Sequence, residues 1–257
     1  MARKRESLIV RLLQYGAIAR WAAAARNAPF ADLDVLRHQR HRARQIRAHV
    51  NELMNVADNR LALPRIGSDA FPSLKGTEWS WRPQLWRSPL ARKGMSAFPS
   101  KTEVDDEITI FHNCKTSELT LRQVRNTCDA DLAPFVLRMD VFRFDGSFLS
   151  LAIDSPQSAC DGLRRRHIVG VNAILDIEKP IEVLARLNMK HGPNTEQLVL
   201  KLPLGQKNCM VEFDLGYLEL NIKRIERMWL DLIFEGPEMN QITIKDITFC
   251  RYTRAEI

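Results

Sequence analysis

The sequence predicts a mainly β protein with an α-helical N-terminal extension, whose C-terminal part is an antiparallel β-sandwich. Three observations predict this fold class. Residues 103–257 hold many short apolar runs with period-two alternation, separated by turn residues. Residues 1–63 are rich in Ala, Leu and Arg, which favour helix. Residues 64–102 carry five prolines, which forbid a long helix there.

The composition is that of a globular protein with a basic appendage. Of 257 residues, 45% are hydrophobic and 27% are charged, which excludes a wholly disordered chain, a collagen-like fibre and a multi-span membrane protein. The net charge is +7, but residues 1–66 alone carry 13 Lys/Arg against 5 Asp/Glu. The first quarter therefore has a balance of +8 and the remainder a balance of −1. This asymmetry indicates an anionic partner for the N-terminal part, or a helix face kept basic for solubility.

The five cysteines form no CxxC pair, and their number is odd. We therefore expect neither a disulfide framework nor a zinc site built from cysteines. The same cysteine usage predicts that the protein works in a reducing compartment. We expect a cytoplasmic protein, peripheral at the membrane if its basic part binds lipid.

The first helix is expected near the N-terminus, where no proline occurs before residue 29. It follows a basic cluster formed by Arg3, Lys4 and Arg5. Arg11 and Arg20 interrupt its apolar residues, so it cannot span a bilayer, which needs about 20 apolar residues in a row. Two interpretations stay open: an amphipathic helix in a membrane interface, with Trp21 at the boundary, or a helix packed on the protein's own surface.

A second, longer helix is expected over about residues 32–63, between Pro29 and Pro64. A heptad pattern runs through it, with Leu36, Ala43, Val50 and Ala57 at one position and Gln39, Ile46, Leu53 and Arg60 at the other. Two of the eight positions are polar, so self-association through residues 33–61 stands beside simple packing of an amphipathic helix.

The N-terminal half of this second helix is basic. Its candidate residues for binding an anionic surface, together with Arg3, Lys4 and Arg5, are Arg37, Arg40, Arg44 and Arg47. No aromatic residue lies among them, so nucleic-acid bases would find nothing to stack on. An anionic membrane surface is therefore favoured over nucleic acid, which would be held by its phosphates alone.

Three tryptophans, Trp79, Trp81 and Trp86, lie in the proline-rich segment 64–102, which we expect to be a linker that wraps on the core. In an extended chain Trp79 and Trp81 project to the same face. The tryptophans either anchor the segment by burying large areas, or form a stacking surface for a sugar ring or a partner protein.

Nine strands are expected in the C-terminal part. They are Glu107–Phe111, Val136–Phe144, Ser147–Ile153, Ile168–Leu175, Ile181–Asn188, Glu196–Lys201, Met210–Leu215, Met228–Phe234 and Ile242–Tyr252. Short strands separated by turns such as Asp145-Gly146 predict an antiparallel sandwich rather than a parallel sheet. In the strand from Met228 both registers are mostly apolar, so we expect it to be central, with Trp229 in the core and Asp231 hydrogen-bonded.

The search for chemistry finds no nucleophile elbow, HExxH helix, P-loop or GxGxxG turn, so we expect no cofactor, no metal site and no catalytic residue. His112 and Cys114, two residues apart on a strand, would form a histidine–thiol pair, and a buried apolar cysteine is the alternative. The one basic cluster of the sandwich comprises Arg164, Arg165, Arg166 and His167. On a loop between strands it would clamp a carboxylate, a phosphate or an acidic sugar, or remain solvated.

The final two strands carry a resemblance. An apolar strand from Trp229 to Phe234 is followed by a turn and by Ile-Thr-Ile-Lys-Asp-Ile-Thr-Phe, from Ile242 to Phe249. This pattern resembles the closing hairpin of galactose-binding-like jelly rolls, and Asp246 matches the acidic residue found there in carbohydrate-binding modules. Longer stretches, such as Met139 to Ile153, resemble an uncharacterised alphaproteobacterial family of unknown function. The first resemblance implies a jelly-roll-like sandwich, and the second implies no activity.

These observations predict a non-catalytic binding protein in three parts: a basic helical region over 1–63, a Trp/Pro-rich linker over 64–102 and a sandwich over 103–257. The sandwich would recognise a glycan or a protein, with the three tryptophans and the basic cluster as candidate binding residues. The helices would attach it to an anionic surface or to another copy. Two alternatives stay open: a saccharide-acting enzyme whose site assembles from distant loops, and a structural assembly component.

Overall fold

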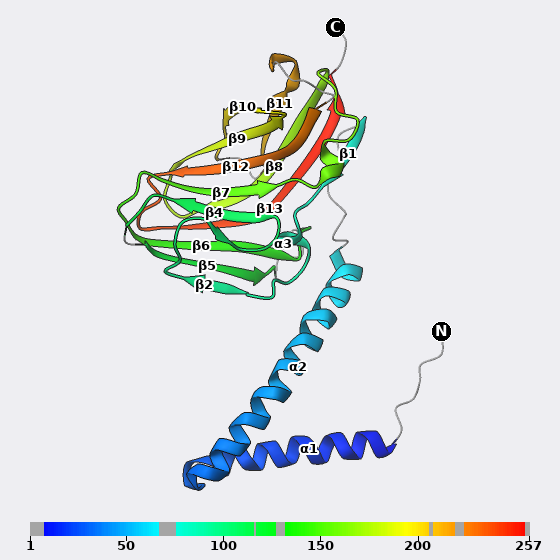
Figure 1. Ribbon diagram of the computed structural model, residues 1–257, viewed down its shortest axis with the longest axis vertical. Helices are drawn as coiled ribbons and strands as arrows, with labels where there is room; N and C mark the ends of the chain where they lie inside the picture. Colours follow the sequence, from blue (N-terminus) through cyan, green and yellow to red (C-terminus); the bar gives the residue numbers. More distant parts are fainter. Residues whose placement is uncertain are drawn as a thin grey trace. The chain divides into compact units, whose positions relative to one another are not determined.

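The computed structural model describes residues 8–66, 76–115, 117–126, 132–205, 208–218 and 224–254. Its contacts divide the chain into two compact units, Met1–Val56 and Ala57–Ile257. The first unit is helical and the second contains two β-sheets (Figure 1).

The helical unit contains α1 (Leu8–Asn27), the short 3-10 helix η1 (Ala28–Phe30) and most of α2 (Leu33–Ile66). Pro29 lies in η1, where the sequence predicts the break between the helices. α2 continues two residues past Pro64, so its predicted end is too early. Three residues of the heptad pattern, Ile46, Val50 and Leu53, are 45%, 45% and 68% exposed, so this part of the pattern faces solvent.

Sheet A has seven strands. Its order is β11 (Cys209–Asp214), β8 (His167–Ile177), β13 (Asn240–Thr253), β6 (Phe135–Phe144), β5 (Ser117–Arg125) and β2 (Gly94–Ser96), and β1 (Thr77–Trp81) also pairs with β13. Along its length β13 pairs first with β6 and later with β1, while β8 lies on its other side.

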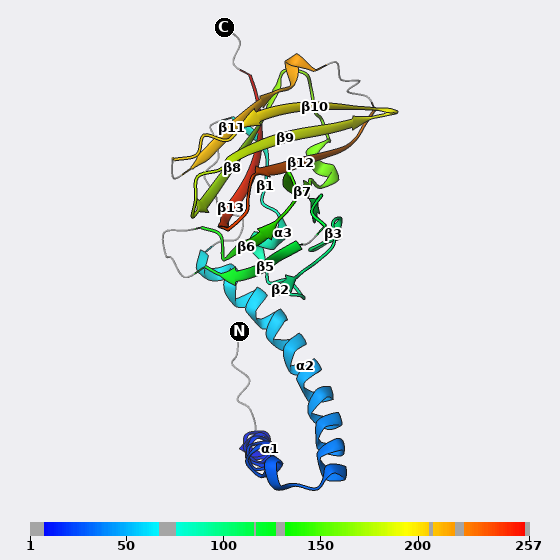
Figure 2. The ribbon, with the colours of Figure 1, turned by 90° about the vertical axis from the view of Figure 1, so that its left-hand side faces the viewer.

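Sheet B has six strands. Its order is β10 (Asn194–Lys201), β9 (Glu182–His191), β12 (Ile225–Glu235), β7 (Phe148–Asp154), β4 (Ile108–His112) and β3 (Thr102–Glu103). Figure 2 shows β10, β9 and β12 side by side as one layer. All described strand pairs in both sheets are antiparallel, which confirms the predicted fold class.

The core lies between the two sheets because alternate residues of each strand point inward. In β12 the inward residues Met228, Leu230, Leu232 and Phe234 are all at most 1% exposed. Inward residues of β8 and β13, such as Val171 and Phe249, are fully buried. Burial of such side chains contributes roughly 1.5–3 kcal/mol each, so this apolar register fixes which face of each sheet points inward.

The strand from Met228 is central in sheet B, as predicted, but the expectation that Trp229 lies in the core is wrong. Trp229 belongs to the other register of β12 and is partly exposed on the outer face of the sheet. Since Leu230, on the opposite register, is fully buried, the apolar pattern alone did not identify the inward face.

The segment expected to be a linker is built into the sandwich. It contributes β1 and β2 to sheet A, β3 to sheet B, and the single-turn helix α3 (Gln84–Arg87). The indole Nε1 of Trp86 donates a hydrogen bond to the carbonyl of Ile244 at 3.0 Å. The Gln123 side chain donates to the carbonyls of Leu85 and Ser88 at 2.6 and 2.7 Å, and accepts from the Leu90 amide at 2.8 Å. The strands of the sandwich therefore begin at β1 rather than at residue 103.

Candidate functional site

The three candidate tryptophans have different environments. Trp86 is fully buried and Trp81 is 8% exposed, with its ring 5.2 Å from that of Phe249. These two side chains anchor the segment and present no face to a ligand. Trp79 is partly exposed, stacks on Trp81 with ring centroids 6.4 Å apart, and donates its Nε1 hydrogen to Ser158 Oγ at 3.3 Å.

The basic run follows the 3-10 helix η2 (Gln157–Ala159) and leads into β8. The side chains of Arg164, Arg165 and Arg166 are exposed, whereas His167 is 1% exposed. The Arg165 guanidinium donates to the carbonyl of Leu218 at 2.8 Å, which holds the loop against the residues after η3 (Leu215–Tyr217).

A polar cluster at this end of the sandwich joins β1, β8 and β13. We name it the Glu78 cluster, formed by Glu78, Arg164, His167, Arg251 and Thr253. The Thr253 hydroxyl donates to Glu78 Oε1 at 2.7 Å, and His167 Nε2 lies 3.3 Å from Glu78 Oε2. Arg251 is 7% exposed, and its guanidinium donates to the carbonyls of Ala159 and Asp161, both at 2.9 Å.

The charges of this cluster act on one another. The Thr253 hydrogen bond lowers the pKa of Glu78 against the opposing effect of burial, and the nearby His167, Arg251 and Arg164 lower it further. Burial lowers the pKa of His167, which the Glu78 carboxylate opposes and Arg251 and Arg164 reinforce. The fold thus brings the basic run together with Glu78, the residue before Trp79, although 89 residues separate Glu78 from His167.

The outer face of sheet B carries a second cluster, of polar side chains around a tryptophan, which the sequence analysis did not identify. It is defined by Asp154, Arg186, Asn188, Arg227, Trp229 and Asp231. Trp229 lies opposite Asp154 on β7 and opposite Asn188 on β9, and Asp231 lies opposite Arg186. Residues paired in this way have Cβ atoms about 4.5–5.5 Å apart, so the group forms one continuous patch.

Two ion pairs hold this patch. The Arg227 guanidinium donates to both carboxylate oxygens of Asp154 at 2.6 Å, and its Cζ lies 4.9 Å from the centre of the Trp229 ring. The Arg186 guanidinium donates two hydrogen bonds to Asp231 Oδ2, at 3.0 and 2.8 Å. The Trp229 ring therefore has a fixed guanidinium over one face and does not rotate freely.

Asn188 is the fully buried member of this patch. Its amide donates to Asp231 Oδ2 at 2.9 Å and to the carbonyl of Arg186 at 3.1 Å, and the residue is fully buried. Its Oδ1 has no hydrogen-bond partner among the described residues. The prediction that Asp231 is hydrogen-bonded is confirmed, since Asn188 and Arg186 both donate to it.

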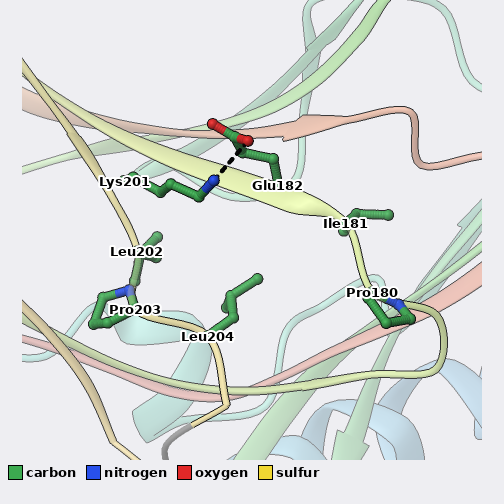
Figure 3. A pocket seen from close by; sticks show the side chains of 7 residues that line it. All are labelled: Pro180, Ile181, Glu182, Lys201, Leu202, Pro203 and Leu204. Atoms are coloured by element: carbon green, nitrogen blue, oxygen red, sulfur yellow. Dashed lines mark hydrogen bonds and ion pairs between the residues drawn. The ribbon is translucent and has the colours of Figure 1, made fainter.

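A pocket of about 590 Å³ lies at the other end of the same sheet, where β9 begins and β10 ends (Figure 3). It is lined by Pro180, Ile181, Glu182, Lys201, Leu202, Pro203 and Leu204. The ammonium group of Lys201 contacts Glu182 Oε2 at 2.7 Å across its rim, and the other lining residues are apolar. Glu182 pairs with Glu235 at the far end of β12 from Trp229. Trp229 and the pocket are thus about six residues, or roughly 20 Å, apart along the strands.

The histidine–thiol pair is present. Cys114 Sγ lies 2.9 Å from His112 Nδ1, and His112 Nε2 lies 3.1 Å from the carbonyl of Phe98. Since Nε2 must donate to that carbonyl, Nδ1 accepts and the Cys114 thiol donates. Burial and the nearby Asp145 charge raise the pKa of Cys114, so the thiol stays protonated and is not activated as a nucleophile.

The structure describes only some of the basic residues that the sequence places in the helical part. Arg37, Arg40, Arg44 and Arg47 are exposed on α2, and Arg37 pairs with Asp34 at 2.8 Å. Arg3, Lys4 and Arg5 lie outside the described residues. None of the helices among the described residues has the length and hydropathy needed to cross a membrane. The described residues also contain no group of three or more His, Cys, Asp or Glu side chains placed to hold a metal ion.

The two-sheet architecture defines the protein as a jelly-roll-like β-sandwich, and the similar solved structures include carbohydrate-binding modules. One is the family 11 module from Clostridium thermocellum in complex with a β-1,3-1,4-mixed-linked tetrasaccharide, at 10% identity and a TM-score of 0.38, covering 65% of this chain and 100% of that one. Another is TmCBM61 in complex with β-1,4-galactotriose, at 14% identity and a TM-score of 0.32, covering 58% and 90%. A third, tailspike protein 4 of bacteriophage CBA120, has 9% identity and a TM-score of 0.39, covering 56% of this chain and 19% of the tailspike. At these identities the likeness concerns the fold alone.

The chain belongs to a family of unknown function, DUF6478, whose family model matches residues 1–257. No curated protein matches the sequence.

Proposed function

We propose that this protein is a non-catalytic binding protein whose sandwich holds a glycan on the outer face of sheet B. One observation carries the proposal: Trp229 is partly exposed on this face, among fixed carboxylate and guanidinium groups. A sugar ring offers apolar C–H faces and hydroxyls that both donate and accept, so an aromatic ring beside carboxylates and guanidinium groups complements it.

The layout of the face favours an extended ligand. Trp229 and the pocket beside Lys201 mark two ends of the face, separated by roughly 20 Å of strand. Between them the outward residues include Leu184 and Ile233, which are partly buried, and Val199, which is 52% exposed. A chain of sugar rings along β12 would contact both ends, whereas a monosaccharide would contact only one.

The test measures binding of the full-length protein to soluble polysaccharides by affinity electrophoresis and calorimetry. The panel contains mixed-linkage β-glucan, β-1,4-galactan and xylan, with bovine serum albumin as the reference protein. We expect retardation by at least one polysaccharide, and a loss of at least tenfold in affinity for Trp229→Ala. Phe142→Ala is the matched control, because Phe142 is 50% exposed on β6 of the other sheet.

Two results would overturn the proposal. One is the absence of binding to every member of the panel and to longer oligosaccharides derived from them. The other is a Trp229→Ala variant that binds as tightly as the wild type. In either case a protein ligand, an enzymatic activity or an assembly role would have to account for the function of the sandwich.

For the helices we propose attachment to an anionic surface at the membrane periphery. The four arginines exposed on α2 support this proposal, since only Arg37 has an ion-pair partner among the described residues. Self-association through residues 33–61 is the second possibility, and the exposed Ile46, Val50 and Leu53 support it.

A further inference from the structure

We propose that the Glu78 cluster is an oxyanion-binding site, in which the Glu78 carboxylate occupies the position that a carboxylate or phosphate group of a ligand would take. This site lies at the end of the sandwich, is built from residues other than those of the sheet B face, and does not depend on glycan binding there. Three steps support the proposal.

The first step is a buried guanidinium that neutral groups hold in place. Arg251 is 7% exposed and donates to the carbonyls of Ala159 and Asp161, and its Nε is buried with no hydrogen-bond partner among the described residues. Carbonyls orient a guanidinium without neutralising it, and a buried cation lacking a full counter-charge is costly. An oxyanion beside Arg251 would remove that cost.

The second step is the histidine. His167 Nδ1 accepts a hydrogen bond from the amide of Arg164 at 3.1 Å, so in neutral His167 the proton is on Nε2. That Nε2 is buried and lies 3.3 Å from Glu78 Oε2, yet it makes no hydrogen bond of good geometry within the described part of the chain. A buried donor left without a well-aligned acceptor is a position that an oxyanion of better geometry would fill.

The third step is that a ligand can displace the Glu78 carboxylate. Its side chain is 46% exposed, and it lies at the start of β1, two residues after Gly76, whose φ is +89°. One hydrogen bond, from Thr253, and the contact with His167 hold the carboxylate. Displacing it costs little, because an exposed carboxylate regains hydration when it leaves.

Two exposed cations remain for the ligand. Within the described residues the side chains of Arg164 and Arg166 have no ion-pair or hydrogen-bond partner, whereas Arg165 is held by the Leu218 carbonyl and Arg254 pairs with Asp214 at 2.8 Å. Guanidinium groups bind carboxylates and phosphates through paired N–H donors. Arg164 and Arg166 would therefore close over an oxyanion that already contacts Arg251 and His167.

The experiment titrates the full-length protein at low salt with inorganic phosphate, glucuronate and glucose, following binding by calorimetry and by the melting temperature. We expect saturable binding of phosphate or of glucuronate and none of glucose. The phosphate and glucuronate titrations distinguish a phosphorylated ligand from a carboxylated one, and either result supports the site.

Variants make the prediction sharper. Glu78→Gln keeps an acceptor for Thr253 but removes the competing charge, so affinity for the oxyanion should rise about tenfold. Arg164→Gln and Arg166→Gln should each lower it about tenfold, while Arg143→Gln, which removes another exposed arginine, on β6, should not change it. Trp229→Ala should leave it unchanged, which separates this site from the proposed glycan face.

The proposal is overturned if neither oxyanion binds the wild type or Glu78→Gln at low salt. It is also overturned if Arg143→Gln weakens binding as much as Arg164→Gln, since that result would show unspecific attraction to the net charge.

Discussion

The guanidinium of Arg82 donates to both carboxylate oxygens of Asp246, from Nε at 2.9 Å and from a terminal nitrogen at 2.8 Å. The two side chains are 0% and 8% exposed, so this is a buried ion pair that joins the segment after β1 to β13. Removing one partner takes away the counter-charge that the other has in this buried pair. We expect Arg82→Ala to lower the free energy of unfolding by about 3–5 kcal/mol.

Urea denaturation of wild type, Arg82→Ala and Arg82→Met/Asp246→Leu measures this effect. The double variant should be less destabilised than the single one, because it buries no lone charge. A loss below ~1 kcal/mol for Arg82→Ala would contradict the structural role assigned to the pair.

Trp229 should contribute little to stability although its ring is large. It lies on the outer face of sheet B and is partly exposed, whereas its neighbour Leu230 is fully buried. Trp229→Ala should therefore cost about 1–2 kcal/mol, and Leu230→Ala about 2–5 kcal/mol. Thermal and urea unfolding of both variants measure the difference. If Trp229→Ala lowered the free energy of unfolding more than Leu230→Ala does, the Trp229 side chain would have to be buried in the core.

Asp105 should make stability depend on pH. Burial, with some repulsion from Glu107, raises its pKa to about 6, against the hydrogen bond that its Oδ1 accepts from the Glu107 amide at 3.0 Å. Its Oδ2 is buried with no partner among the described residues. Because the folded pKa is above the ordinary value of 3.8, the favourable contribution is complete below that value and is lost as the pH rises through about 6.

Asp105→Asn should therefore stabilise the protein at pH 7.5, by on the order of 1 kcal/mol after solvent screening, and have almost no effect at pH 4. Melting temperatures of the variant and the wild type at the two pH values measure this difference. Asp106→Asn is the control, because it makes the same charge change at an exposed neighbour. Equal effects of the two variants at pH 7.5 would show that net charge, and not burial, is responsible.

The strands were predictable because the period-two pattern is local. All nine predicted strands are present, with boundaries shifted by a few residues. β5 was missed because its inward positions, Leu119 and Leu121, are followed by Gln123, which interrupts the apolar alternation. The partners that satisfy Gln123 lie 33 to 38 residues earlier in the chain, so no local pattern shows that this glutamine is buried.

The candidate site was less predictable, because its contacts join residues that are far apart in the sequence. The basic run was visible in the sequence, but its relation to Glu78 depends on the pairing of β1 and β8 with β13. The patch around Trp229 was missed because both registers of β12 are apolar, and only the packing of the two sheets determines which one faces outward. Likewise Asp246, visible as an acidic residue in an apolar strand, finds its partner Arg82 164 residues away.

The final prediction concerns the basic helical part, whose +8 charge balance over residues 1–66 favours binding to anionic surfaces. Such contacts are mainly Coulombic, so affinity should fall steeply as salt rises. Insertion of apolar side chains into a lipid headgroup layer would add a salt-resistant remainder, whereas phosphate contacts to DNA would leave almost none. Trp21 is the one tryptophan in this segment, so a blue shift of its fluorescence reports insertion directly.

The measurement is flotation of a peptide comprising residues 1–66 with neutral and with anionic liposomes, beside a titration with duplex DNA at matched ionic strength. We expect retention by anionic liposomes only, a blue shift of Trp21 fluorescence, and binding that persists in part at high salt. A variant in which Arg37, Arg40, Arg44 and Arg47 are replaced by Gln should lose most of the salt-sensitive part and keep the fluorescence shift once bound. Coulombic attraction is strongest at low salt. If neither lipid nor DNA retains the peptide under that condition, the charge serves only to solvate the helices.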